Sequence, residues 1–156
     1  MCKCEDCNCV EKKLKIVSLP HCIKLPEYKT ECASGMDLVA CIDDTIVLNP
    51  LERVMIPTGI KVGIPKGYEG QIRPRSGKAY RDGITVINTP GTIDSDFTGE
   101  LKILAVNLSD KMQMIQRGER IAQLVITPVV QLPIEIVGEL EETERGEGGF
   151  GHTGKF

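Results

Sequence analysis

Aromatic residues are scarce in this chain of 156 residues, which has no Trp and only 4% Phe and Tyr. Aliphatic side chains must therefore fill the core, and a hydrophobic fraction of 41% is enough for one domain of this length. The net charge is small as well, at −3. It argues against a general nucleic-acid-binding protein, since such proteins are usually basic. An anionic ligand would need a local cluster of Arg, Lys and backbone N–H groups.

The sequence also lacks long apolar runs. No stretch reaches 18 apolar residues, so we expect no membrane span. The N-terminus carries Cys and acidic residues where a signal peptide would have an apolar segment, which predicts a cytoplasmic protein. In a reducing compartment the seven cysteines are thiols rather than disulfides.

Turn-forming residues, by contrast, are plentiful: 16 Gly and 9 Pro punctuate short runs rich in Val, Ile and Thr. These runs predict strands at residues 45–48, 51–56, 58–64, 68–73, 83–87, 100–108, 120–130 and 134–137. One short helix is expected at residues 76–81. Many short strands with so little helix favour a sandwich or barrel over a parallel α/β sheet.

Three regions differ in composition. Residues 1–13 form a Cys-rich extension, residues 14–138 form the β domain, and residues 139–156 form a polar tail that ends rich in glycine. Such a tail cannot pack a core, so we expect it to be mobile unless a ligand orders it.

Two segments of the domain combine polar groups at predicted strand ends. Two Arg, a Ser and a Gly in residues 73–78 stand where a strand gives way to the helix, which suits either an anion site or a solvated basic turn. Asp94 and Asp96 follow a strand among turn residues. One of them could act as a general base toward water, or both could belong to a surface turn.

Two further polar residues interrupt apolar runs, and the tail carries its own donors. Gln123 must find partners within a strand, either a ligand or neighbouring backbone. Asp37 could stand near a metal ion, although a turn bond at a strand end is the simpler reading. In the tail, glycines allow a close approach to phosphates, and Phe150 could stack on a base.

In this order and spacing, the five segments resemble the five motifs of the trimeric dUTP diphosphatase (dUTPase) family, over roughly residues 14–153. The tail RGEGGFGHTG is similar to that of the bacterial branch. The resemblance implies a jelly-roll-like β-barrel of the dUTPase-like β-clip type and a homotrimer. Three active sites would lie at subunit interfaces, each built from all three chains. The reaction would convert dUTP to dUMP and pyrophosphate with Mg²⁺, which keeps uracil out of DNA and supplies dUMP for thymidylate synthesis.

The resemblance also implies roles for individual residues. Asp94 would be the catalytic base, and Asp37 would orient Mg²⁺ through water, with no direct protein ligand to the metal. Phe97 stands where many members have Tyr; its ring would lie under the deoxyribose and exclude a ribose. The residues expected to contact the substrate are Arg75, Ser76, Gly77, Asn88, Thr92, Ile93, Asp94, Phe97, Lys102, Gln123, Arg145, Phe150, Gly151, His152 and Thr153.

Two alternatives remain open at this point. The same fold could deaminate dCTP, although the tail is of the hydrolase type. The chain could also be an interaction protein, for which its one extra feature is a cluster of thiols that could bind Zn²⁺ or Cu⁺. That cluster consists of Cys2, Cys4, Cys7 and Cys9.

Overall fold

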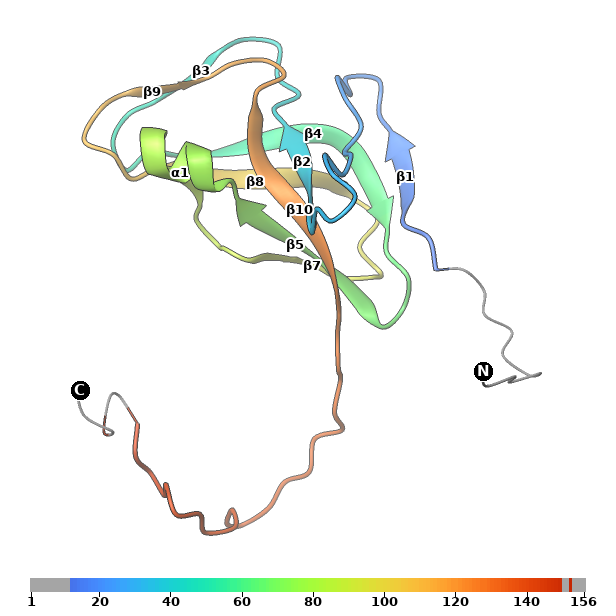
Figure 1. Cartoon of the computed structure of the whole chain (residues 1–156), viewed down its shortest axis with the longest axis vertical. Coiled ribbons are helices and arrows are strands. Elements are labelled where there is room, and N and C mark those ends of the chain that lie inside the picture. The colour runs from blue at the N-terminus through green and yellow to red at the C-terminus, as the bar shows by residue number, and fades with distance from the viewer. Residues whose placement is uncertain (1–11, 150–151, 153–156) are drawn as a thin grey trace.

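The computed structural model describes residues 12–149 and residue 152. This part of the chain has ten strands, which form three sheets, and one short helix (Figure 1). The elements, in chain order, are β1 (Lys15–Ser18), β2 (Gly35–Val39), β3 (Ile46–Leu48), β4 (Arg53–Gly63), β5 (Tyr68–Pro74), α1 (Ser76–Asp82), β6 (Ile84–Val86), β7 (Gly91–Ile93), β8 (Glu100–Asn107), β9 (Gln113–Ile115) and β10 (Arg120–Pro128).

The sheets have the orders β1-β4-β8-β6, β2-β10-β5-β7 and β3-β9. All pairs of neighbouring strands are antiparallel. The all-β prediction with a short helix at residues 76–81 is therefore confirmed. The arrangement is jelly-roll-like, but among the described residues the three hydrogen-bonded sheets do not close into one continuous barrel.

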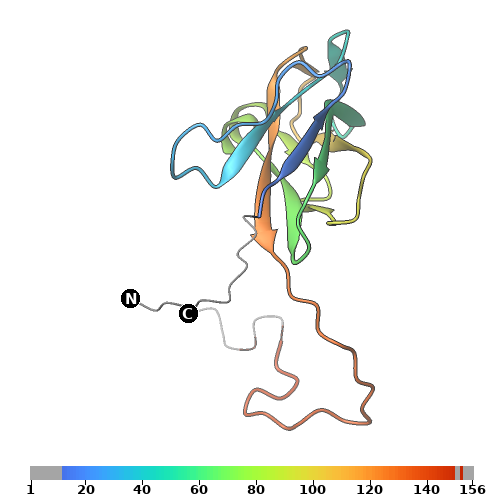
Figure 2. The same ribbon diagram turned by 90° about the vertical axis from the view of Figure 1, so that its right-hand side faces the viewer.

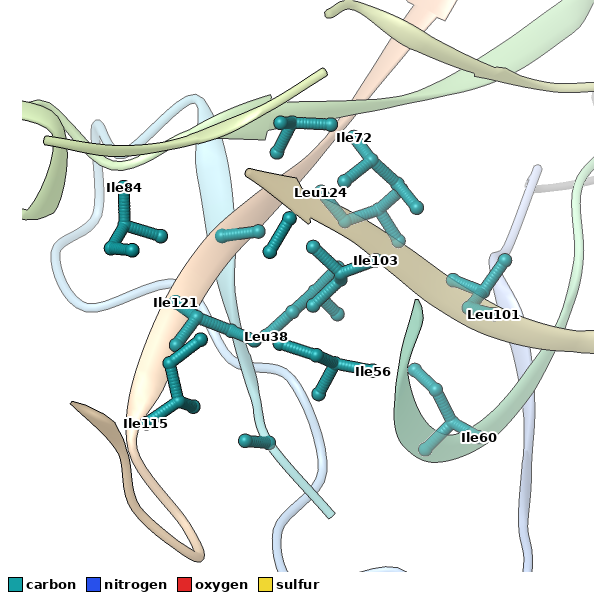
Figure 3. Packing of buried hydrophobic residues seen from close by; sticks show 14 of the residues in the cluster. Leu38, Ile56, Ile60, Ile72, Ile84, Leu101, Ile103, Ile115, Ile121 and Leu124 are labelled. Carbon is teal, nitrogen blue, oxygen red and sulfur yellow. The ribbon is translucent and has the colours of Figure 1, made fainter. Parts of the chain in front are cut away.

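The core is aliphatic, as the scarcity of aromatic residues requires. Its buried cluster contains Met36 and otherwise only Ala, Val, Leu and Ile. Figure 3 shows side chains of both four-stranded sheets meeting there, among them Leu38, Ile56, Ile103 and Leu124. Alternate residues of each strand point inward, which fixes the register and hence which polar residues remain on the outer faces.

One predicted boundary is wrong. Residues 51–56 and 58–64 were expected to form two strands separated by Pro57, yet β4 runs through that proline. The register of β4 against β8 shifts between Pro57 and Lys61, so a bulge absorbs the irregularity. A proline removes only one ladder donor, and a bulge is one of the places where a sheet tolerates that loss.

The predicted and observed strands also differ where the sequence pattern is short or where a predicted strand has no partner. The sequence prediction missed β1, β2, β7 and β9, each of which has five residues or fewer. The strand expected at residues 134–137 is absent, and Ile134 and Ile136 are 94% and 96% exposed. No strand among the described residues pairs with this alternating segment.

Residues 129–149 form an arm that leaves the sheets after β10 (Figures 1 and 2). Most of its apolar side chains are exposed, including Val130 at 82% and Leu132 at 80%. The arm carries the segment expected to act on the nucleotide, so its direction away from the body bears on how a site is completed. None of the helices in the described part of the chain is long and apolar enough to cross a membrane.

Helix α1 is held in place at both ends. Arg75 precedes it in an extended conformation, and Gly83 ends it with φ 66°. A Cβ on Gly83 would lie 2.7 Å from the Cβ of Ser109, so a larger residue there would both strain the backbone and clash. The helix and the strand β5 before it therefore present Arg75, Ser76 and Gly77 at a defined corner of the fold.

Candidate active site

Five of the predicted substrate-contacting residues line one small cavity. Its volume is about 260 Å³, and its walls come from β4 to β8 and the turns beside β7. The lining residues are Met55, Ile72, Val86, Asn88, Gly91, Thr92, Ile93, Phe97, Lys102 and Leu104. Apolar walls with an amide, a hydroxyl and an ammonium group suit a flat polar ring better than a highly charged group.

The wall contributed by Phe97 depends on a glycine. The Phe97 side chain is 42% exposed, and a Cβ on Gly99 would lie only 2.6 Å from its ring. The backbone N–H of Phe97 donates to the carbonyl of Asp94 at 3.2 Å, which closes the turn between them. The local fold thus places an aromatic ring at the mouth of the cavity and Asp94 beside it.

Asp94 itself lines a different depression of the surface. With Ser95, Asp96 and Glu69 it lines a wide depression of about 830 Å³, and the start of the arm, residues 129–131, lines the same depression. Ile93, the preceding residue, lines the small cavity. Asp94 therefore stands at the boundary between the cavity and an open surface of the chain.

A second group of predicted residues gathers around Asp37. One carboxylate oxygen of Asp37 accepts a hydrogen bond from Nε of Arg75 at 2.8 Å, and the other accepts from Nη1 of Arg120 at 2.9 Å. Arg75 also donates to the backbone carbonyl of Arg120 at 3.2 Å. The simpler reading of Asp37, a turn bond at a strand end, is wrong, because it lies mid-strand in β2 and holds two guanidinium groups.

Gln123 lies next to this group on β10. Its Nε2 donates to the carbonyl of Pro74 at 3.0 Å, and its side-chain oxygen covers Gly35 so closely that a Cβ there would be 2.3 Å away. Its interior partner is therefore neighbouring backbone. The contact ties Gln123 to the residue before Arg75, so both belong to the same corner.

Arg120 is the functional candidate that the sequence prediction did not include. It begins β10, in the same segment as Gln123, and its side chain is 49% exposed. A basic residue at a strand start near a predicted ligand contact was the available signal. Two guanidinium groups around one carboxylate leave a net positive charge, which favours an anionic ligand.

The two groups of residues lie far apart within one chain. β2 and β7 are the opposite edges of their sheet, three strand spacings or about 14 Å apart. Asp37 is in register with Arg73 across β10. Ile93, which precedes Asp94, pairs with Gly70. Asp94 is therefore also about 13 Å away along the strands, which makes roughly 20 Å in total from Asp37. One chain alone cannot bring both carboxylates to the same phosphate.

The described part of the tail touches neither group. Arg145 donates from Nε to the carbonyl of Gly148 at 2.8 Å, which closes a local turn. The backbone N–H of His152 donates to the carbonyl of Gly149, and its side chain is exposed. Phe150, Gly151 and Thr153 lie outside the described residues, and so do the thiols of Cys2, Cys4, Cys7 and Cys9.

Direct metal ligands are not assembled in the described residues, where no three His, Cys, Asp or Glu side chains come together to hold an ion. The Asp37 carboxylate still has lone pairs to offer, since each oxygen accepts one hydrogen bond from an arginine and an ionised carboxylate has about four acceptor sites. Its chemistry fits a contact with metal-bound water.

Comparison with known proteins gives one consistent result. The profile of the dUTPase family matches residues 21–154. A deoxyuridine 5'-triphosphate nucleotidohydrolase of Fusobacterium nucleatum is 55% identical over 133 residues, which cover 85% of this chain and 91% of that protein.

Solved structures agree. A variant of the Staphylococcus bacteriophage 80alpha dUTPase with dUpNHpp has a TM-score of 0.82 at 30% identity, covering 92% of this chain and 99% of that one. A variant of the dUTPase from phage phi11 of S. aureus has a TM-score of 0.75 at 27% identity, over 84% of this chain and 100% of that one. The latter structure is described as showing how a structural Mg(II) ion is coordinated.

Proposed function

The chain belongs to the dUTPase family, and we propose that it hydrolyses dUTP to dUMP and pyrophosphate. The observation that carries this function is the pairing of two sites on one chain. A small cavity suits a base and sugar, and a guanidinium cluster suits phosphates. At about 260 Å³ the cavity is below the roughly 300–1,000 Å³ of drug-sized ligand pockets, so it fits a nucleoside and leaves the triphosphate outside.

Base recognition is assigned to the turn around β7. Asn88, Thr92 and Ile93 line the cavity together with apolar walls, and their polar groups would pair with the edge of uracil. Cytosine would leave those groups unpaired, at about 1–3 kcal/mol for each buried polar group. Thymine would be rejected because a tight wall leaves no room for its methyl group.

Sugar recognition is assigned to Phe97, and Lys102 lines the same cavity. The ring would lie under the deoxyribose and exclude a 2′-hydroxyl by steric contact. This discrimination does not need the hydroxyl that Tyr would supply, so Phe is sufficient for it.

Catalysis is assigned to Asp94. Its carboxylate would accept a proton from a water molecule whose oxygen attacks the α-phosphorus. The bond from the α-phosphorus to the oxygen that bridges to the β-phosphate breaks, and pyrophosphate leaves with the electron pair. Asp94 would also bond the sugar 3′-hydroxyl, and its position directly after Ile93, which lines the cavity, supports this role.

Phosphate binding is assigned to Arg75, Ser76, Gly77 and Gln123. Arg75 and Gln123 are both anchored near Pro74, which supports their acting on one ligand. Mg²⁺ would be held mainly by the phosphates and water, with Asp37 contacting it through water. When bound, the ion neutralises charge on the phosphate oxygens and acts as a Lewis acid.

We further propose a homotrimer in which three chains contribute to each site. The separation of roughly 20 Å between Asp37 and Asp94 supports this, because the two must act on one triphosphate. The exposed apolar arm supports it as well, since surfaces of that kind mark contacts with another chain. The tail segment with Arg145, Phe150, Gly151, His152 and Thr153 would close over a site of a neighbouring chain, stacking Phe150 on uracil and excluding water.

A cytoplasmic location is part of the proposal. The described cysteines, Cys22, Cys32 and Cys41, are all free thiols, which suits a reducing compartment.

A substrate panel tests the function. Pyrophosphate release is measured with dUTP, dTTP, dCTP and UTP in the presence of Mg²⁺, and ammonia release from dCTP is followed in parallel. We expect rapid release from dUTP and far slower release from the other three. Comparable rates on all four would contradict the assignment, and ammonia from dCTP would indicate deamination instead. Asp94→Asn should abolish turnover while dUTP still binds.

A further inference from the structure

Helix α1 carries a lysine that is almost entirely buried. The Lys78 side chain is 7% exposed, and its ammonium group contacts two carboxylates, Glu119 at 2.5 Å and Asp82 at 2.9 Å. Burial alone would lower the pKa of Lys78, but the hydrogen bonds to Glu119 and Asp82 outweigh burial and raise the pKa above its ordinary value. The group is therefore charged throughout the working pH range. A buried charge without a catalytic contact needs another reason to be there.

The contact with Glu119 joins two segments that are distant in the sequence. Lys78 lies two residues after Ser76 in α1, and Glu119 directly precedes Arg120. The turn that contains Glu119 is itself fixed. Its other carboxylate oxygen accepts from the N–H of Gln116 at 2.9 Å, and its carbonyl accepts from the N–H of Ala40 at the same distance.

Together with Asp37, this ion pair makes a double connection between the two arginines. On the outer side, Asp37 joins Arg75 to Arg120, and both guanidinium groups are accessible, at 28% and 49% exposure. On the inner side, Lys78 joins the helix that follows Arg75 to the residue that precedes Arg120. A bound triphosphate would draw hydrogen bonds of the guanidinium groups away from Asp37. The inner connection uses neither guanidinium group, and the Lys78 side chain at its centre is 7% exposed, so this connection would persist when the ligand binds.

We propose that Lys78 is a positioning residue, which through its ion pair with Glu119 keeps Arg75 and Arg120 at the spacing that binds the triphosphate. The inference rests on the proposed function. Lys78 does not touch the nucleotide in this account. It acts by fixing α1 against the turn before β10, so that both guanidinium groups converge without rearrangement when the phosphates arrive.

The same lysine provides a matched control. The contact of Lys78 with Asp82 lies within α1, four residues apart, and connects the helix to nothing else. Asp82 is 32% exposed and Glu119 is 30% exposed, so the two carboxylates are similarly accessible to water, and neutralising either one removes a charge from a similar environment. Only the loss of Glu119 releases the turn that carries Arg120.

The test compares Lys78→Met, Glu119→Gln, Asp82→Asn and the double variant Lys78→Met/Glu119→Gln in the full-length protein. The affinities for dUpNHpp and dUMP, both with Mg²⁺, are measured by calorimetry, and kcat and KM for dUTP are measured alongside the melting temperature. We expect Lys78→Met and Glu119→Gln to weaken dUpNHpp binding roughly 10- to 100-fold, since small misplacements of positioning groups have effects of that size. Binding of dUMP should change much less, and Asp82→Asn should resemble the wild type.

The double variant should bind dUpNHpp no more weakly than either single variant, because both changes remove one connection. The proposal is overturned if Glu119→Gln binds dUpNHpp as Asp82→Asn does. It is also overturned if dUpNHpp and dUMP affinities fall in parallel, which indicates general loss of structure. Glu119→Gln keeps the test valid if Lys78→Met does not fold. Failure of the proposed function would look different, since the wild type would then release no pyrophosphate from dUTP.

Discussion

Two variants that are each inactive should restore activity to one another when their chains assemble together. Asp94→Asn removes the proposed base, and Arg75→Ala removes a guanidinium group of the phosphate site. Arg75 is held by Asp37 at 2.8 Å, and Asp37 lies roughly 20 Å from Asp94 within a chain. If both residues act on one nucleotide, each site must take them from different chains.

The size of the restoration follows from this geometry. In an equal and random mixture, half of the chains have an intact Asp94 and the other half an intact Arg75. A given site takes one residue from each of two independent chains, so about one quarter of all sites are intact in a closed ring of identical interfaces. The mixture should therefore show about one quarter of the wild-type rate per site.

The assay unfolds the two variants together in urea, refolds them by dilution, and measures pyrophosphate release at saturating dUTP with Mg²⁺. Wild-type protein and each variant alone pass through the same cycle as controls. A mixture no more active than the mean of its two parents would refute the reasoning. Asp94 and Arg75 would then belong to one chain's site, or the chains would not share sites at all.

Three further outcomes are expected. Truncation after Glu144 should lower kcat strongly while size-exclusion chromatography shows an unchanged oligomer, and full activity would rule out a catalytic role for the tail. Burial raises the pKa of Glu100, but hydrogen bonds from His21 at 2.7 Å and the N–H of Gly59 at 2.9 Å outweigh burial and hold the pKa below its ordinary value. The carboxylate therefore stabilises the fold above that value, and the benefit is lost as the pH falls through the lowered pKa. Glu100→Gln should lower the free energy of unfolding by about 1 kcal/mol at pH 7, measured by urea denaturation. The difference between the variant and the wild type should shrink in acid, and a difference that stays constant would disprove the reasoning. Leu124→Ala, in the fully buried core, should reduce the free energy of unfolding by about 2–5 kcal/mol in the same measurement, and a loss below 1 kcal/mol would contradict its placement there.

Sequence patterns predicted most of the strands, because the position of a strand depends largely on residues that are neighbours in the sequence. Short runs rich in Val, Ile and Thr between turn residues identified β5, β8 and β10 to within a few residues of their observed bounds. The same reasoning split β4 at Pro57, since a proline looks like an end of a strand until the bulge that accommodates it is known. It also predicted a strand at residues 134–137, which pair with no strand in the part of the chain that the structure describes.

The order of the motifs predicted which residues form the candidate site. It did not predict the hydrogen bonds and ion pairs that connect them. Asn88, Thr92, Ile93, Phe97 and Lys102 do meet in one cavity. The contacts that organise the phosphate corner could not be read from the sequence, because their partners are far apart along it.

Lys78 is the clearest case of this limit. Beside a glycine in a basic segment it looks like a solvated residue, and its partner Glu119 lies 41 residues away. Only the fold shows that its ammonium group is buried between two carboxylates. Charge patterns predict a surface well when the partner is four residues away, and poorly when it comes from another strand.

In the proposed trimer, activity would be a property of the assembly rather than of the folded chain. Each chain presents the cavity proposed for the nucleoside near one edge of its second sheet and the guanidinium cluster proposed for the phosphates near the other, so under the proposal neither alone holds a whole nucleotide. The arm that leaves this sheet after β10 exposes Ile134 and Ile136 almost completely. Apolar side chains in water are unfavourable, so burying the arm against another chain would drive the same association that completes the site. Stability of the oligomer and completion of the active site would thus both depend on the apolar part of the arm that precedes Glu144, and a polar substitution at Ile134 or Ile136 should affect both together.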